Sequence, residues 1–203
     1  AIRRQRQMCI RDRDTLRKEN DLPVLGVVEP SCREALAVTK NKKIGMIATL
    51  ASARSGAYER TLKGLDADVQ VVSQPCPLFV PLVENGRFRV GDTVIETVAR
   101  EYLEPLRREG LDTLILGCTH YPLLTDIIGD IMGPGVTLIN TGEEAAWELK
   151  RTLRGLDLLA PEGPAGRATL CASDQPEQFG VMASYFLGES LTRPVQPVDI
   201  DRY

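Results

Sequence analysis

A thiol and an imidazole lie two residues apart in the stretch LILGCTHYPLL, Leu114 to Leu124. Cys118 is one of five cysteines, and His120 is the only histidine of the chain. An apolar run precedes Gly117 and Cys118, which indicates a buried strand that ends there. Since glycine has no side chain, another group can approach the backbone closely at Gly117. A thiolate at such a position could act as a base or as a nucleophile.

Two interpretations of this stretch compete. Most free cysteines are small buried hydrophobes, and Cys118 alone would be read that way. A helix beginning near Tyr121 and Pro122, however, would point its free N–H groups at the strand end, where they lower a thiol pKa and bind carboxylates. Because His120 at i+2 is poorly placed for the ion pair of cysteine hydrolases, acid–base chemistry at carbon fits better. A small-molecule binding module without chemistry stays open.

The elements that position this stretch are predicted from apolar runs and punctuation. Apolar strands that alternate with helices favour an α/β fold with parallel sheets flanked by helices on both faces. Strands are predicted at 23–28, 43–49, 68–76, 112–118, 136–142 and 168–174, and helices at 14–22, 31–42, 52–65, 91–110, 121–133, 143–155 and 175–188. We interpret 77–86 as a proline-punctuated loop, 156–167 as a connector, and Ser31 as the N-cap of its helix.

Ligands of parallel sheets bind at the carboxyl ends of the strands. The polar residues at these ends are Glu29, Thr49 to Ser52, Cys76, Cys118 to His120, Asn140 with Thr141, and Ser173 with Asp174. Of the other cysteines, we expect Cys32 to be structural, Cys76 to line the cleft without reacting, and Cys171 to belong to the core.

Composition excludes several classes of protein. The chain has 203 residues, is 43% hydrophobic and 26% charged, and carries a net charge of −3, which argues against a nucleic-acid-binding body. It has no apolar stretch long enough to span a bilayer. An odd number of cysteines without CxxC spacing fits neither a disulfide framework nor a zinc site, and suits a reducing compartment.

The first thirteen residues, AIRRQRQMCIRDR, hold five Arg and one Asp and differ in composition from the rest of the chain. They could form a basic nucleic-acid arm, an Arg-rich transit peptide or a solvated terminus. MCIRDR is also the translation of ATG-TGT-ATA-AGA-GAC-AG, which resembles a transposon-end sequencing adapter. We therefore expect residues 1–13 to be an assembly artefact in which Cys9 has no function.

The stretch LGCTHYPLL resembles the second cysteine motif of glutamate racemases, the PLP-independent members of the aspartate/glutamate racemase superfamily. Four further stretches match in order: VLGVVEP, IGMIATLASARSGAYERTL, CPLFVPLVENG and TLINTGEEAA. Aspartate racemases tend to carry Glu where His120 stands, so the resemblance favours glutamate as the substrate. The family usually has Gly at position 48 and Asp at position 140, where this chain has Ala and Asn.

The resemblance implies a role for five residues. Cys118 and His120 would be catalytic, with Cys118 as one of two thiols that flank the α-carbon. His120 would also belong to the substrate site, and would either assist proton transfer at Cys118 or help to balance the developing carbanion charge. Thr119 would hold the substrate carboxylate, and Thr49 and Glu84 would line the substrate site, with Glu84 near the ammonium group. A solvated loop acid is the alternative for Glu84. No metal and no cofactor are implied.

The family fold has two similar α/β lobes, and the resemblance implies that the first lobe is incomplete here. We expect a second lobe at 31–155, which carries the Cys-Thr-His motif, and a remnant of the first lobe at 14–30 and 156–203. The stretch Ala-Cys-Asn-Thr-Ala, which carries the family's first cysteine, is expected upstream of Asp14, so the chain as written should be inactive.

The resemblance also implies a cytoplasmic bacterial enzyme that supplies D-glutamate for peptidoglycan and binds neither nucleic acid nor membrane. It is compatible with a homodimer. Two alternatives remain: another cofactor-independent racemase of the superfamily, acting on aspartate or a hydantoin, and the non-catalytic binding module.

Overall fold

The computed structural model describes residues 12–19, 23–161, 163, 166 and 168–199. The chain divides into two compact units, Ala1–Leu159 and Ala160–Tyr203. Residues 1–11, which include Cys9 and most of the adapter-like segment, lie outside the described residues.

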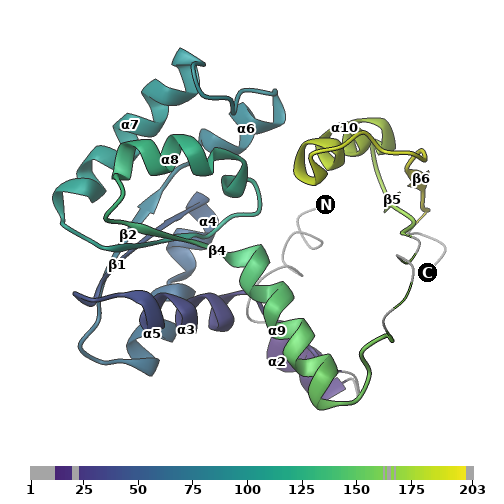
Figure 1. The fold of residues 1–203 in the computed structure, drawn as a ribbon, viewed down its shortest axis with the longest axis horizontal. Helices are drawn as coiled ribbons and strands as arrows, with labels where there is room; N and C mark the ends of the chain where they lie inside the picture. Colours follow the sequence, from purple (N-terminus) through teal and green to yellow (C-terminus); the bar gives the residue numbers. More distant parts are fainter. Residues whose placement is uncertain (1–11, 20–22, 162, 164–165, 167, 200–203) are drawn as a thin grey trace. The chain divides into compact units, whose positions relative to one another are not determined.

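The first unit is built on a parallel sheet with the strand order β2-β1-β3-β4 (Figure 1). The strands are β1 (Lys43–Ala48), β2 (Gln70–Pro75), β3 (Thr113–Leu116) and β4 (Thr137–Asn140). Each lies inside a run predicted as a strand, so the predicted α/β class with a parallel sheet between helices is confirmed. Since the strands are parallel, all four carboxyl ends meet at one edge.

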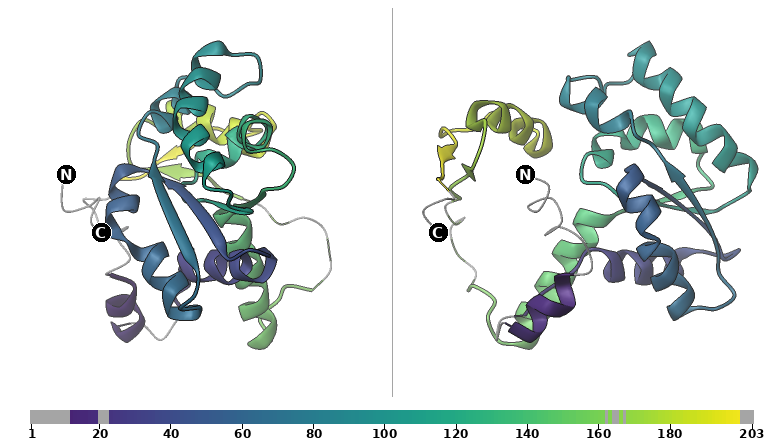
Figure 2. Two further views of the ribbon diagram at one scale, coloured as in Figure 1. Left: turned by 90° about the vertical axis from the view of Figure 1, so that its left-hand side faces the viewer. Right: turned by 180° about the vertical axis from the view of Figure 1, so that it is seen from behind.

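Helices cover both faces of this sheet. Successive strand side chains point to opposite faces, and one set packs with α3 (Val28–Val38) and α5 (Ala57–Leu65) into a buried cluster. The strand members of that cluster are Ile44, Met46, Ala48, Ile115 and Ile139. The helices α7 (Thr93–Arg108) and α8 (Thr125–Met132) pack against each other over the other face (Figures 1 and 2). Burial on both sides explains why the central strands β1 and β3 show no polar alternation.

The strand predicted at 23–28 is wrong. Residues 23–26 have no regular structure, and α3 begins at Val28, before the expected Ser31 cap. Pro30 fits the first helical turn because its missing N–H has no partner to lose there. Ser31 instead donates its hydroxyl back to the Val27 carbonyl at 2.7 Å. No strand among the described residues pairs with 23–28, and of its apolar side chains Val28 is buried in the core cluster while Val27 is 49% exposed.

Two other elements differ from the prediction. The helix predicted at 52–65 is two helices, α4 (Leu50–Ser55) and α5, separated by Gly56 at φ +64°, a conformation that glycine adopts readily. The predicted loop at 77–86 contains the helix α6 (Phe79–Glu84). Its prolines suggested a loop, yet Phe79 and Val83 are four residues apart on one buried face, which is sufficient for a helical turn.

Two further helices of the first unit lie within predicted helices or overlap them. The helix α9 (Thr141–Gly155) begins where the side chain of Asn140 accepts hydrogen bonds from the N–H groups of Gly142 and Glu143. The helix α2 (Asp12–Glu19) overlaps the helix predicted at 14–22. Asn140 thus serves as an N-cap, a role that Asn and Asp fill equally well.

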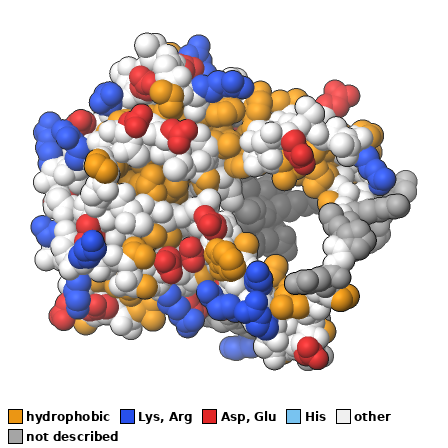
Figure 3. Space-filling model, viewed as in Figure 1, with side chains coloured by type: hydrophobic (Ala, Val, Ile, Leu, Met, Phe, Trp, Pro, Cys, Tyr) orange, Lys and Arg blue, Asp and Glu red, His pale blue; other side chains and the backbone are white. Residues whose placement is uncertain are grey.

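The second unit is small, and its described residues form one helix and two short strands. Two-residue strands β5 (Cys171–Ala172) and β6 (Gln196–Pro197) pair in parallel, and α10 (Pro176–Leu187) lies between them in sequence. The strand predicted at 168–174 is therefore much shorter than expected. No described residue of α10 is buried, and its exposed large apolar side chains are Phe179, Val181, Phe186 and Leu187. Apolar side chains also lie among charged ones on the surface drawn in Figure 3.

Candidate active site

The loop that carries Cys118 is tied to the neighbouring strand by backbone contact. β3 ends at Leu116, and the N–H of Gly117 donates to the Ile47 carbonyl at 2.8 Å. A Cβ atom on Gly117 would lie 2.9 Å from that same carbonyl oxygen, so only glycine fits without displacement. Cys118 is thus held half-buried at the carboxyl edge of the sheet, beside the end of β1.

An aromatic clamp fixes the loop from the other end. Tyr121 begins the short 3-10 helix η2 (Tyr121–Leu124) and is fully buried. Its hydroxyl donates to the Cys76 carbonyl at 3.0 Å, and its ring meets Phe79 edge-on at 5.3 Å between centroids. The clamp joins the ends of β2 and β3, so the residues between Leu116 and Tyr121 are held at both sides. Sequence reasoning missed it, because its partners are 45 residues apart.

His120 lies between a thiol and a carboxylate. Its Nδ1 lies 3.9 Å from Cys118 Sγ and 3.3 Å from Thr119 Oγ1, while its Nε2 lies 3.3 Å from Glu84 Oε1. The side chain of His120 is 21% exposed and the side chain of Glu84 is 45% exposed. The last residue of α6 therefore contacts the Cys-Thr-His motif directly, a relationship that sequence spacing alone could not reveal.

Thr49 lies at the adjacent strand end. Its backbone follows β1, and it caps α4 by accepting a hydrogen bond from the Ser52 N–H at 3.4 Å. Continuing the β1–β3 register beyond Ile47 and Leu116 places Thr49 level with Cys118. Among the described hydrogen bonds, none joins the Thr49 hydroxyl to Cys118, Thr119 or Glu84. The residues that the structure brings into direct contact are Cys118, Thr119, Glu84 and His120.

The expected lowering of the Cys118 pKa by a helix N-terminus is wrong. Burial raises the pKa of this thiol, and the nearby Glu84 carboxylate raises it further, against lowering by the backbone N–H groups of His120 and Thr119 and by the Thr119 hydroxyl. The physical reason is that burial outweighs the hydrogen-bond donors of the loop; the four-residue η2 follows this loop, and α8 begins only at Thr125. Cys118 therefore rests as a neutral thiol at neutral pH.

The other described cysteines do not form a second reactive site in the first unit. Cys32 is fully buried, and burial followed by the Glu29 charge raises its pKa to about 12, which confirms the expected structural role. Cys76 is also fully buried and its pKa is raised by burial, so it does not line a cleft as predicted. Cys171 is exposed rather than part of a core, because β5 is two residues long and joins a two-stranded sheet.

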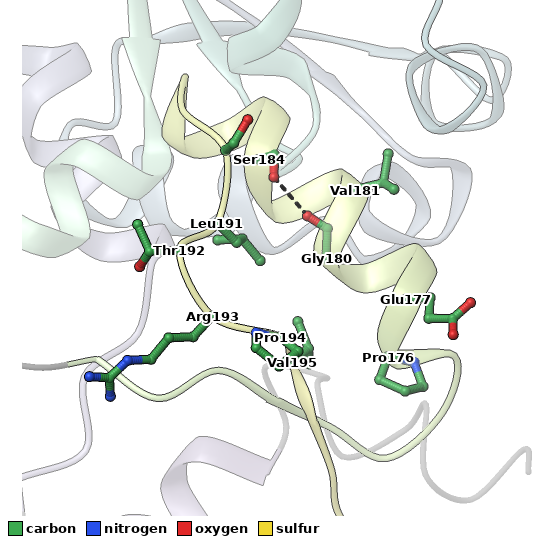
Figure 4. A pocket seen from close by; sticks show the side chains of 11 residues that line it. Pro176, Glu177, Gly180, Val181, Ser184, Leu191, Thr192, Arg193, Pro194 and Val195 are labelled. Atoms are coloured by element: carbon green, nitrogen blue, oxygen red, sulfur yellow. Dashed lines mark hydrogen bonds between the residues drawn. The ribbon is translucent and has the colours of Figure 1, made fainter.

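A hollow of about 630 Å³ lies within the second unit, between α10 and the segment that leads to β6 (Figure 4). Its charged lining residues are Glu177 and Arg193, and it contains no thiol or imidazole. In the described part of the chain, no three His, Cys, Asp or Glu side chains come together as ligands for a metal ion. The chemistry-bearing groups are thus those around Cys118. No helix among the described residues is long and apolar enough to cross a membrane.

Comparison with known proteins gives one consistent family. Residues 9–149 match the family model described as Asp/Glu/Hydantoin racemase. A glutamate racemase of Geobacter metallireducens is 42% identical over 178 residues, which are 88% of this chain and 65% of that protein. A glutamate racemase of Mycobacterium ulcerans is 42% identical over 192 residues, covering 93% of this chain and 69% of that protein.

A solved structure shows the same fold. The glutamate racemase isoform RacE1 of Bacillus anthracis superposes with a TM-score of 0.84 at 35% identity, over 96% of this chain and 70% of that one. The chain spans about two thirds of the length of these relatives. The matched region includes the sheet, the loop of Cys118 to His120 and Glu84. On the agreement of family model, relatives and fold, the chain belongs to the Asp/Glu/Hydantoin racemase family.

Proposed function

We propose that the chain carries one catalytic half-site of a cofactor-independent glutamate racemase, in which Cys118 exchanges a proton with the α-carbon of glutamate. One observation carries this proposal. The thiol of Cys118 lies 3.9 Å from an imidazole whose other nitrogen is 3.3 Å from a carboxylate, at the carboxyl edge of a parallel sheet. The relatives' names support glutamate as the substrate.

The chemistry requires an acid on one face of the α-carbon and a base on the other. A base removes the weakly acidic α-proton from one face, and Cys118 delivers its thiol proton to the opposite face. The S–H bond breaks, the sulfur keeps the electron pair, and a C–H bond forms. In the reverse direction the Cys118 thiolate takes the proton. The raised pKa of Cys118 makes the thiol the resting form, which suits the donor role.

The neighbouring side chains have distinct roles in this proposal. His120 accepts or returns the proton that Cys118 exchanges, and Glu84 holds the imidazole through Oε1. Since a carboxylate has two oxygens, the other oxygen of Glu84 can contact the substrate ammonium group. Thr119 and Thr49 contact the substrate carboxylate at adjacent strand ends.

We extend the proposal to the cell by family resemblance. D-Glutamate made in the cytoplasm would enter peptidoglycan, and the enzyme would act as a homodimer. Within the described part of the first unit, Cys118 is the one cysteine that is not fully buried, since Cys32 and Cys76 are at 0% exposure, so we propose that this unit supplies a thiol for one face. Inversion by the whole enzyme then needs another thiol on the opposite face. In the family this is the first cysteine, which lies in the Ala-Cys-Asn-Thr-Ala stretch.

The test compares two serine variants in a version extended upstream with the first-cysteine segment. Cys118→Ser should reduce glutamate inversion by at least about 100-fold, as loss of an acid–base group does, while the affinity for D-glutamate measured by calorimetry stays within about threefold. Cys171→Ser, at an exposed cysteine of the second unit, should be unchanged. Unchanged inversion by Cys118→Ser would remove Cys118 from catalysis and favour a binding module.

A further inference from the structure

Two side-chain atoms of the Cys118-Thr119-His120 tripeptide lie beside the same imidazole nitrogen. His120 Nδ1 lies 3.3 Å from Thr119 Oγ1 and 3.9 Å from Cys118 Sγ. The Thr119 oxygen and the Cys118 sulfur thus both lie beside the same nitrogen, and hydrogen bonding from the Thr119 hydroxyl lowers the pKa of the thiol. One hydroxyl proton is therefore within reach of two acceptors, the imidazole nitrogen and the sulfur.

The contact with Glu84 determines which nitrogen of His120 carries the hydrogen. A carboxylate only accepts hydrogen bonds, so Oε1 at 3.3 Å favours the hydrogen of His120 on Nε2. The Nδ1 of neutral His120 is then an acceptor. While Cys118 is a thiol, its sulfur needs no donor, and the Thr119 hydroxyl can donate to Nδ1. Once Cys118 has lost its proton, the sulfur becomes the stronger acceptor.

We infer that Thr119 is a positioning residue whose hydroxyl donates to His120 Nδ1 beside the Cys118 thiol and rotates to donate to Sγ beside the thiolate. The Thr119 proton is never transferred; only its direction changes. The hydroxyl joins the backbone N–H groups of Thr119 and His120 as a third donor to the sulfur. This rests on the proposed function for its place in the reaction, and it assigns the hydroxyl to the sulfur rather than to the substrate in the thiolate state.

The other ionisable groups around the sulfur do not substitute for this donor. Glu84 from α6 is an anion and opposes the thiolate. Tyr58 from α5 and Tyr121 from η2 are buried, and burial raises the pKa of both phenols, so they stay neutral. The Tyr121 hydroxyl is already committed to the Cys76 carbonyl. Among these groups, Thr119 is thus the side-chain donor to the thiolate, beside the backbone N–H groups of Thr119 and His120.

The test measures alkylation of Cys118 by iodoacetamide as a function of pH in the 203-residue chain. Peptide mapping by mass spectrometry follows Cys118 separately from the exposed Cys171. Thr119→Val removes the hydroxyl and should raise the pH midpoint by about one unit, which is a tenfold smaller thiolate fraction at a given pH. Thr119→Ser keeps a hydroxyl and should match the wild type.

Thr119 is exposed, so both variants should fold, and their thermal unfolding midpoints check this. A midpoint in Thr119→Val that equals the wild type, or that falls below it, would overturn the inference; a fall would mean that the hydroxyl serves His120 alone. The readout needs no substrate. A negative alkylation result therefore leaves the racemase proposal standing, and loss of that proposal leaves this measurement valid.

Discussion

Glu84 and His120 are in contact through Oε1 and Nε2 at 3.3 Å, although they are 36 positions apart in the chain. The contact joins the end of α6 to the loop after β3. It aligns carboxylate, imidazole and the thiol of Cys118 in one row at the edge of the sheet. The electrostatic consequence is measurable at the thiol.

Glu84→Gln should make Cys118 easier to ionise. The Glu84 carboxylate raises the pKa of the thiol, so replacing it with a neutral amide should lower the alkylation midpoint of Cys118 by about 0.5 pH unit, a small shift because a half-exposed charge is screened. Glu59→Gln removes a carboxylate paired with Lys63 and serves as the control. A midpoint that rises in Glu84→Gln would contradict this arrangement of carboxylate, imidazole and thiol.

Gly117→Ala should destabilise the first unit and displace the loop of Cys118. The new methyl group would lie 2.9 Å from the Ile47 carbonyl oxygen, which is backbone and cannot rotate away. We expect a loss of about 1–3 kcal/mol in the free energy of unfolding, as for other overpacked sites, measured by urea denaturation. Gly129→Ala, in α8 with open space around it, should be neutral or stabilising. Equal effects of the two variants would refute the role given to Gly117.

Asp112 stabilises the turn that leads into β1. Its Oδ1 accepts the Thr39 hydroxyl at 2.6 Å, and its Oδ2 accepts the N–H groups of Lys40 and Asn41 at 2.7 and 2.8 Å. Burial opposes ionisation, but these hydrogen bonds outweigh it, so the pKa of the carboxyl is lowered. Asp112→Asn should cost about 1–2 kcal/mol at pH 7.

The pH dependence of that cost has a definite sign. Since the folded pKa of Asp112 is below the unfolded value of about 3.9, its ionic contribution is complete above that pH and is lost as the pH falls through the folded pKa. The stability difference between wild type and Asp112→Asn should therefore shrink in urea titrations below pH 4. Asp130→Asn, on an exposed face of α8, is the control. A difference that grows on acidification would exclude this role.

The sheet and the position of Cys118 follow directly from the sequence. The apolar runs of β1 and β3 permit burial on both faces, and Gly117 marks the close approach to β1. Parallel strands bring their carboxyl ends together, so Thr49 and the Cys-Thr-His motif were predicted at one edge.

The remaining features depend on contacts between distant residues. Proline at positions 77 and 81 concealed α6, whose buried face is only visible once η2 and α7 pack beside it. The stretch 23–28 has the composition of a strand, but strand formation needs a pairing partner, which composition does not report. The pKa of Cys118 is raised because burial outweighs the hydrogen-bond donors of the loop. The degree of burial depends on the packing of distant segments, so the spacing of residues in the sequence does not predict it.

The most direct test of Cys118 as an acid–base group is α-proton exchange in deuterated water, with the 203-residue chain and each glutamate enantiomer separately. NMR detects deuterium at the α-carbon, and chiral separation detects inversion. We predict slow deuterium uptake into one enantiomer only, its loss in Cys118→Ser, and no inversion. Inversion of L- to D-glutamate by this chain, or uptake that persists unchanged in Cys118→Ser, would contradict the assignment of Cys118 to one face of the α-carbon.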